Sequence, residues 1–272
     1  MSSCRFCGGQ LQPAPGGYGC CERCDVMISG IPAAGYTHDY YYALANARSA
    51  ASLRRAAMLV ELAEGDLAGR RCLDFGCNDG SVVAALTARG RYCIGVDINE
   101  SMLRFARSCG DGDFRLPEEV RELFDSVTAF DVIEHFERPA QFFDAIERYL
   151  EPSGRLLITT PNKNSKWRAI YGAGWHGYGI PQYHRLLMSE KFLRHQLERF
   201  GYMVEKVMSV PPIDTPRWRL LVASGYRLRG SWAGKLAAAP GSVVKLIAGG
   251  FTHGEEDTLY AVARKGGKRW RN

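Results

Sequence analysis

The stretch of sequence that most constrains the fold of this chain covers residues 71–97. A short apolar run, residues 71–75, leads into the glycine-bearing turn 76–80, and a helix-forming run follows. A second apolar run, residues 92–96, comes directly after that helix. This order of strand, turn, helix and strand is the unit of an open, mostly parallel sheet, in which ligands bind at the edge where the strands end.

Carboxylates occupy the positions where a ligand would meet this unit. Asp74 closes the first apolar run, Asp79 lies inside the turn, and Asp97 follows the second run. The turn does not match the G-x-G-x-x-G dinucleotide fingerprint, and acids beside it would repel a pyrophosphate. They suit a cationic or hydroxyl-rich ligand, and Asp97 suits a bidentate hydrogen bond to the two hydroxyls of a ribose.

The turn resembles the first motif of class I S-adenosylmethionine-dependent methyltransferases, D/E-x-G-x-G-x-G, which here reads D-F-G-C-N-D-G over residues 74–80. Asn78 replaces the middle glycine, and asparagine tolerates a positive φ angle better than other non-glycine residues. The resemblance implies that the turn holds the methionyl part of S-adenosylmethionine and that Asp97 holds its ribose. The alternative is an ordinary strand, turn and helix without a cofactor. The residues assigned to the cofactor by this resemblance are Asp74, Gly76, Cys77, Asn78, Gly80, Asp97, Ile98, Asp113 and Phe130.

A second motif covers residues 124–139, F-D-S-V-T-A-F-D-V-I-E-H-F-E-R-P, and looks like the fourth-strand motif of small-molecule methyltransferases. Its strand is expected to deliver Phe130 and His135 into the cofactor crevice. His135 is a candidate general base because an unperturbed imidazole titrates near neutral pH. The alternative is that it only shapes the loop beneath the cofactor. In the resembled family an acid at the end of the third strand faces the adenine amino group, and Asp113 occupies that place.

The connector 161–188 is long and rich in aromatic residues and histidines. A long loop without its own periodicity is usually functional or disordered, so we expect this one to form a lid over an apolar or ring-shaped substrate. Residues 179–186, G-I-P-Q-Y-H-R-L, resemble the P-x-H-L segment of methyltransferases from sugar, quinone and natural-product pathways. His184 is therefore a second candidate base, with the alternative that it ties the lid down by hydrogen bonds.

The N-terminal segment 1–30 carries two C-x-x-C pairs. So short and glycine-rich a segment cannot bury a core alone, but four thiolates can hold one structural zinc ion tetrahedrally. Cys20 is a possible substitute for Cys21, although it forms a looser C-x3-C pair, and free or redox-active cysteines are the alternative. The predicted zinc ligands are Cys4, Cys7, Cys21 and Cys24.

These patterns predict an α/β fold: a Rossmann-like, seven-stranded, mostly parallel sheet with helices on both faces and a small zinc ribbon before it. We expect the sixth strand at residues 202–210 and the last strand inserted antiparallel beside it. The insert between them, 211–256, is predicted to form amphipathic helices, which either touch a membrane surface or extend the core and pair subunits. The expected domains are a zinc ribbon at 1–30, a linker and helix at 31–64, and a methyltransferase domain at 65–272.

The charge of the chain and its N-terminal sequence narrow the range of possible functions. The net charge of +6 comes mostly from the last nine residues, without which the chain has 30 basic and 29 acidic residues. A nearly neutral body argues against a nucleic-acid groove, and the N-terminus lacks an apolar signal core, so we expect a cytoplasmic protein. The resemblance predicts O-methylation of a small hydroxylated metabolite such as a natural product, sugar or quinone. The alternatives are an rRNA base methyltransferase, a sugar C-methyltransferase and a non-enzymatic scaffold.

Overall fold

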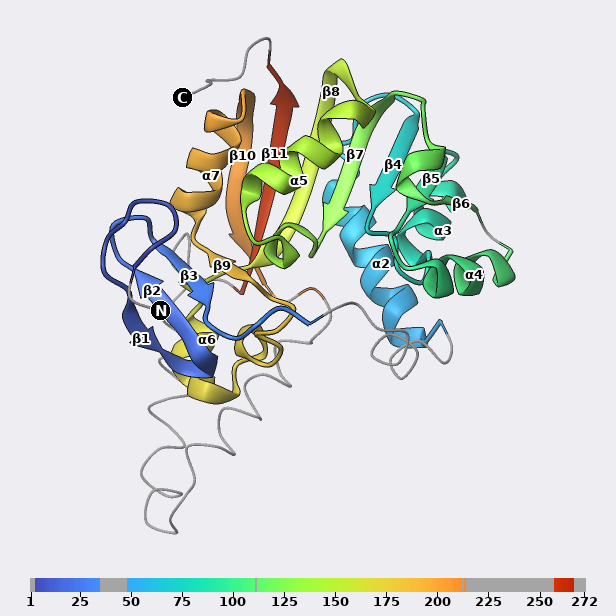
Figure 1. Ribbon diagram of the computed structural model, residues 1–272. Helices are drawn as coiled ribbons and strands as arrows, with labels where there is room; N and C mark the ends of the chain where they lie inside the picture. The colour runs from blue at the N-terminus through green and yellow to red at the C-terminus, as the bar shows by residue number, and fades with distance from the viewer. Residues whose placement is uncertain (1–2, 35–47, 111, 212, 214–256, 267–272) are drawn as a thin grey trace, which may run out of the picture.

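The computed structural model describes residues 3–34, 48–110, 112–211, 213 and 257–266 (Figure 1). Two sheets organise these residues, a large seven-stranded one and a four-stranded one formed around the N-terminus. Most of the insert 211–256 lies outside the described residues, as do the first part of the predicted N-terminal helix and the end of the basic tail. Within the described part of the chain, no helix has the length and apolar character needed to cross a membrane.

The large sheet confirms the predicted fold class. Its strand order is β10-β11-β8-β7-β4-β5-β6, and β11 runs antiparallel to both of its neighbours while the other adjacent pairs are parallel. The last strand is therefore inserted beside the sixth, as the sequence predicted. The strands are β4 (Arg71–Phe75), β5 (Tyr92–Val96), β6 (Asp113–Arg115), β7 (Phe124–Phe130), β8 (Leu150–Pro161), β10 (Tyr202–Val210) and β11 (Thr258–Lys265).

Helices cover both faces of this sheet, which explains why its central strands read as continuous apolar runs. Helices α5 and α7 pack into one core, and α2, α3 and α4 pack into another on the opposite face (Figure 1). Two helices begin directly after residues whose side chains cap them: the Asn99 side chain accepts hydrogen bonds from backbone amides of α4, and the Ser189 side chain accepts one from an amide of α7. The helices are α2 (Ala50–Ala63), α3 (Ser81–Ala88), α4 (Glu100–Ser108), α5 (Pro139–Ile146) and α7 (Glu190–Arg199).

The small sheet joins the N-terminal segment to the rest of the molecule. Strands β1 (Gln12–Ala14), β2 (Tyr18–Cys21) and β3 (Val26–Ser29) form an antiparallel meander, and we call residues 3–29, which contain it, the ribbon. Its fourth strand is β9 (Leu186–Met188), which comes from the segment predicted to be a lid and pairs with β3. The sequence did not indicate this pairing, because two strands so far apart in the chain leave no local signal.

The aromatic residues of the predicted lid are mostly buried. They lie in the short helix α6 (Lys166–Tyr171) and in the segment that follows it. With residues of the ribbon they form a third hydrophobic core. Trp175 is held there by a hydrogen bond that its indole N–H donates to the carboxylate of Asp257, the residue before β11, at 2.7 Å. The buried members of this core are Tyr18, Met27, Trp167, Trp175, Tyr178 and Leu187.

Candidate active site

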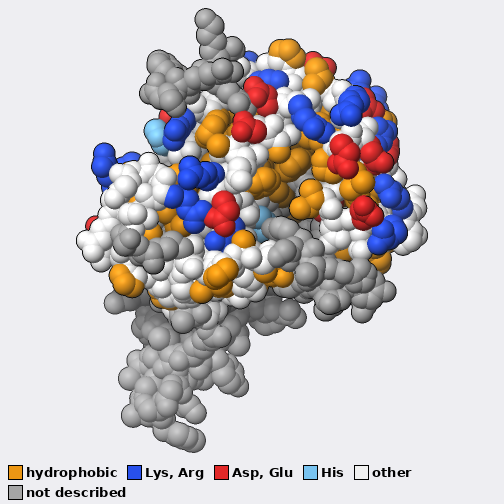
Figure 2. All heavy atoms as spheres, in the orientation of Figure 1, with side chains coloured by type: hydrophobic (Ala, Val, Ile, Leu, Met, Phe, Trp, Pro, Cys, Tyr) orange, Lys and Arg blue, Asp and Glu red, His pale blue; other side chains and the backbone are white. Residues whose placement is uncertain are grey.

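A cavity of about 640 Å³ lies at the carboxyl ends of β4, β5 and β7, within the size range of small-ligand sites. Figure 2 shows hydrophobic side chains gathered in a hollow near the centre of this face, with charged side chains around it. The structure brings most of the predicted cofactor and catalytic residues together here. Those that line the cavity are Asp74, Gly76, Cys77, Asn78, Asp97, Ile98, Phe130, His135 and His184.

The turn after β4 has the backbone conformation expected from its sequence. Asn78 has a φ angle of 46°, in the left-handed region that asparagine tolerates. Gly80 has a φ angle of 74°, and a Cβ atom on it would lie 2.4 Å from Cζ of Phe114. Gly80 does not line the cavity, but a larger residue there would displace either the turn or the Phe114 ring.

Asp74 lies at the floor of the cavity and is only 3% exposed. Its Oδ1 accepts a hydrogen bond from Thr128 Oγ1 at 2.8 Å. Burial raises the pKa of Asp74 to about 7; the Thr128 hydrogen bond lowers it, and the charges of Asp97 and Asp79 make smaller contributions that raise it. A carboxyl with this pKa can ionise fully when a cation binds beside it.

Asp97 connects the two loops that border the cavity. Its Oδ2 accepts a hydrogen bond from the Asn78 amide at 3.0 Å, and its Oδ1 accepts one from the Asn99 amide at 2.9 Å. Burial raises the pKa of Asp97. Each carboxylate oxygen can accept a second hydrogen bond, so the side chain can still bind two neighbouring hydroxyls. Next to it, Ile98 is 68% exposed and offers an apolar surface at the cavity edge.

Asp113 does not reach the cavity. The motif predicts it at the end of the third strand, and that prediction is wrong: β6 begins at Asp113, so the residue lies at the amino end of the strand and away from the ligand edge. Its carboxylate instead accepts a hydrogen bond from Nε of Arg115 at 3.0 Å. Pro117, beyond the strand's carboxyl end, lines the cavity in its place.

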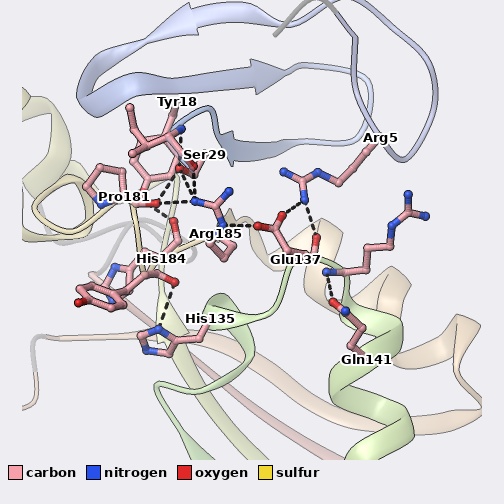
Figure 3. Close-up of polar contacts among 12 residues, drawn as sticks. Arg5, Tyr18, Ser29, His135, Glu137, Gln141, Pro181, His184 and Arg185 are labelled. Atoms are coloured by element: carbon pink, nitrogen blue, oxygen red, sulfur yellow. Dashed lines mark hydrogen bonds and ion pairs between the residues drawn. The ribbon is translucent and has the colours of Figure 1, made fainter. Parts of the chain in front are cut away.

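His135 and His184 face each other on the opposite side of the cavity, with ring centroids 5.1 Å apart. Nδ1 of His135 lies 3.2 Å from the Tyr183 carbonyl (Figure 3). A carbonyl can only accept, so Nδ1 carries the proton and Nε2 presents a lone pair. Burial lowers the pKa of His135, which keeps the ring neutral near pH 7.

Asp131 and Arg55 also line the cavity, and the sequence motifs did not single out either residue for the site. They form an ion pair across the cavity wall, and Thr159 Oγ1 also donates to Asp131 at 2.9 Å. Burial alone would raise the pKa of Asp131, but the Arg55 charge and the Thr159 hydrogen bond lower it below its ordinary value. Asp131 lies inside the recognised 124–139 motif, whereas Arg55 had no sequence signal beyond its place on a helix.

Glu134 is fully buried behind the two histidines and accepts a hydrogen bond from Thr160 Oγ1 at 3.0 Å. Burial, together with the nearby Asp131 charge, raises the pKa of Glu134 well above its ordinary value. The donor atoms of Glu134, His135 and His184 lie within 4.8 Å of one another, which is close enough to hold a metal ion.

The four predicted cysteine ligands converge in the ribbon. Their sulfur atoms lie within 4.8 Å of one another, with 3.6 Å between those of Cys7 and Cys21 and 3.9 Å between those of Cys4 and Cys24. Cys20 is not part of this group. No disulfide links any of these cysteines to one another. A tetrahedral zinc ion with Zn–S bonds of about 2.3 Å separates its sulfurs by about 3.8 Å, so this donor set fits zinc.

The chain is similar in sequence to known methyltransferases. The profile of a family described as a methyltransferase domain matches residues 36–207, more than half of the chain. A ubiquinone biosynthesis O-methyltransferase from Pseudomonas entomophila (strain L48) is 35% identical over 120 residues, which are 39% of this chain and 52% of the relative. The enzyme of the same name from Pseudomonas aeruginosa (strain LESB58) is 34% identical over 111 residues, 37% and 48% of the two chains. The chain thus spans about half the length of these curated relatives.

Solved structures show the same fold at low sequence identity. A SAM-dependent methyltransferase from Archaeoglobus fulgidus aligns with a TM-score of 0.52 and 20% identity over 83% of this chain and all but 1% of its own. Phosphoethanolamine N-methyltransferase 2 from Haemonchus contortus, solved with S-adenosyl-L-methionine, aligns with a TM-score of 0.53 and 18% identity over 86% of this chain and 61% of its own.

Proposed function

This chain belongs to the methyltransferase-domain family, and we propose that it is an S-adenosylmethionine-dependent O-methyltransferase acting on a small hydroxylated metabolite. The observation that carries the proposal is the division of one cavity into two sides. Asp74 and Asp97 lie on the side of the glycine turn, and the neutral His135 faces His184 on the other. The names of the curated relatives support oxygen as the methyl acceptor.

The turn side would hold the cofactor. When bound, S-adenosylmethionine supplies a methyl group already activated on a sulfonium, so the protein has to position the acceptor and exclude water. Asp97 would hold the ribose through the acceptor capacity that its two amide hydrogen bonds leave, and Ile98 would cover the base. Asp74 would meet the cationic end of the cofactor and ionise as it binds.

The histidine side would hold the acceptor. With Nδ1–H donating to the Tyr183 carbonyl, Nε2 of His135 is oriented to take the proton of an acceptor hydroxyl. The lowered pKa of His135 keeps this nitrogen unprotonated at neutral pH. We assign His184 to the same side, where it confines the acceptor next to His135.

We further propose that the four-cysteine cluster holds a structural zinc ion. Four thiolates leave no open coordination position, so the ion would stabilise the ribbon without taking part in the chemistry. The spacing of the sulfur atoms supports this assignment, and so do free cysteines in a protein that we predict to be cytoplasmic.

The proposal is tested by incubating the purified protein with methyl-labelled S-adenosylmethionine and cell extract separated into RNA, lipid and small-molecule fractions. We expect label in the small-molecule fraction as a methyl ether. Label in RNA would replace this proposal with the rRNA alternative, and label that survives ether cleavage would indicate a carbon acceptor such as that of a sugar C-methyltransferase. Cofactor binding without transfer to any fraction would support the scaffold alternative.

A further inference from the structure

The ribbon is continuous with the acceptor side of the cavity. Strand β9 completes its sheet, with Ile28 of β3 opposite Leu186. Leu186 comes only two residues after His184, so the chain leaves the cavity wall and enters the ribbon's sheet almost at once. A displacement of the ribbon would therefore be transmitted directly to the segment that carries His184.

Arg185 ties this segment to the ribbon and is only 5% exposed. Its Nη1 donates to Ser29 Oγ at 3.0 Å and to the carbonyls of Ile31 at 2.6 Å and Pro181 at 2.9 Å (Figure 3). Its Nε donates to Oε1 of Glu137 at 2.5 Å. One buried guanidinium thus joins the end of β3, the loop before His184 and the loop after His135.

Glu137 is shared between the two modules. It lines the cavity, and its carboxylate pairs with Arg5 as well as with Arg185 (Figure 3). Arg5 also donates to the Glu137 carbonyl at 3.0 Å. Because Arg5 lies between Cys4 and Cys7, the first knuckle of the proposed zinc site contacts the cavity wall through a single side chain.

Tyr18 holds the main chain of His184 itself. The Tyr18 hydroxyl, on β2 of the ribbon, donates to the His184 carbonyl at 2.9 Å. The residue before it, Tyr183, offers the carbonyl that orients His135. The carbonyls of Tyr183 and His184 thus hold both histidines of the acceptor side in place, and the ribbon binds this segment through Tyr18.

We propose that the ribbon is a positioning element of the active site, in which Tyr18 and Arg185 are positioning residues that hold His184 against His135. The role assigned to the two histidines rests on the proposed function, but their contact can be measured without it. The ribbon therefore serves the reaction through the acceptor side of the cavity. The cofactor side, built from β4 and β5, shares a hydrophobic core with the ribbon but receives none of the Tyr18 and Arg185 hydrogen bonds described above.

The first test removes the metal from the full-length protein with a zinc chelator. Hydrogen exchange followed by mass spectrometry should show amides 183–188 exchanging faster by about tenfold or more, the effect of losing roughly one buried hydrogen bond. The peptide covering β4 and α3 should keep its protection, and S-adenosylhomocysteine should bind with unchanged affinity. Unchanged protection at 183–188, or equal loss of protection in β4 and α3, would overturn the proposal.

The second test keeps the metal in place and compares Tyr18→Phe with Tyr260→Phe. Each substitution removes a phenol hydroxyl that donates a hydrogen bond of 2.9 Å, but the Tyr260 partner is Asp66, outside the cavity lining. The Tyr18 hydroxyl also lies 3.4 Å from the Gly177 carbonyl. Both variants should retain one zinc ion. In NMR spectra, Tyr18→Phe should shift the His184 ring signals and weaken the cross-peaks between the His184 and His135 rings, and Tyr260→Phe should leave both unchanged.

The outcomes separate this proposal from the proposed function. Failure of the wild-type protein to bind S-adenosylhomocysteine would refute the proposed function. The positioning role would still be tested by the NMR contact between His135 and His184. An unchanged contact in Tyr18→Phe, with cofactor binding intact, would sink the positioning role alone. Loss of the contact in Tyr260→Phe as well would show a general loosening of the fold and would also refute the role.

Discussion

Replacement of Asp74 by asparagine tests the electrostatics of the cavity floor. In the folded protein burial raises the pKa of this carboxyl from 3.8 to about 7. The folded state therefore binds more protons than the unfolded state between about pH 4 and pH 7, so the free energy of unfolding falls as pH rises through that window. At about 1.4 kcal/mol per pKa unit, the cost of keeping Asp74 ionised in the empty cavity approaches about 4 kcal/mol above pH 7.

Asp74→Asn removes that cost and can still accept the Thr128 hydrogen bond. In the absence of cofactor, the variant should be more stable than the wild type at pH 8, by up to about 4 kcal/mol, and nearly equal to it at pH 4. Urea denaturation at several pH values measures the difference. Asp144→Asn, which removes one exposed carboxyl on α5 outside the cavity, serves as the control for the change in net charge.

The same substitution should have the opposite effect on binding. A cationic cofactor favours the ionised form of Asp74, so wild-type affinity for S-adenosylmethionine should fall by up to about tenfold per pH unit below pH 7. The variant should bind weakly at every pH. A stability difference between variant and wild type that does not change with pH would refute the reasoning, because it would show that Asp74 does not titrate between the folded and unfolded states.

Three further predictions follow from the geometry. Cys21→Ser should lower bound zinc, measured by atomic absorption, and lower the melting temperature, whereas Cys20→Ser should retain one zinc ion per chain; zinc loss only from the latter would reassign the ligand. Gly80→Ala should lower the free energy of unfolding by about 1–3 kcal/mol, because alanine is strained at positive φ and its Cβ would meet Phe114; unchanged urea midpoints would contradict this. His135→Ala should reduce kcat by about 10²–10⁴-fold on the acceptor found in the fractionation while leaving cofactor affinity intact, and full turnover at neutral pH would remove the base assignment.

Features set by neighbours in sequence were predicted well. The apolar run 92–96 is β5 to the residue, and the strand predicted at 202–210 is β10 with the same bounds. In the turn at 76–80, Asn78 adopts a left-handed backbone conformation, which was predicted because asparagine tolerates a positive φ angle. Each of these depends on periodicity, capping or backbone freedom within a few residues, and such information is present in the local sequence.

Features set by distant contacts were not predictable in this way. The pairing of β3 with β9 joins residues more than 150 positions apart, and the Arg55–Asp131 ion pair joins a helix to a strand end. Asp113 shows the same limit on a smaller scale, since a shift of the strand boundary by two residues moves a carboxylate from the ligand edge to the opposite end of the strand. The aromatic residues of the predicted lid could not be assigned to a core before their partner, the ribbon, was known to lie against them.

The central claim is that the cavity between the glycine turn and Asp97 binds S-adenosylmethionine, and calorimetric titration of the purified full-length chain tests it most directly. We predict saturable binding of one molecule per chain, strongly weakened by Asp97→Ala, which removes the proposed ribose contact. No heat of binding and no rise in melting temperature with the wild-type protein, or equal binding by Asp97→Ala, would contradict the assignment.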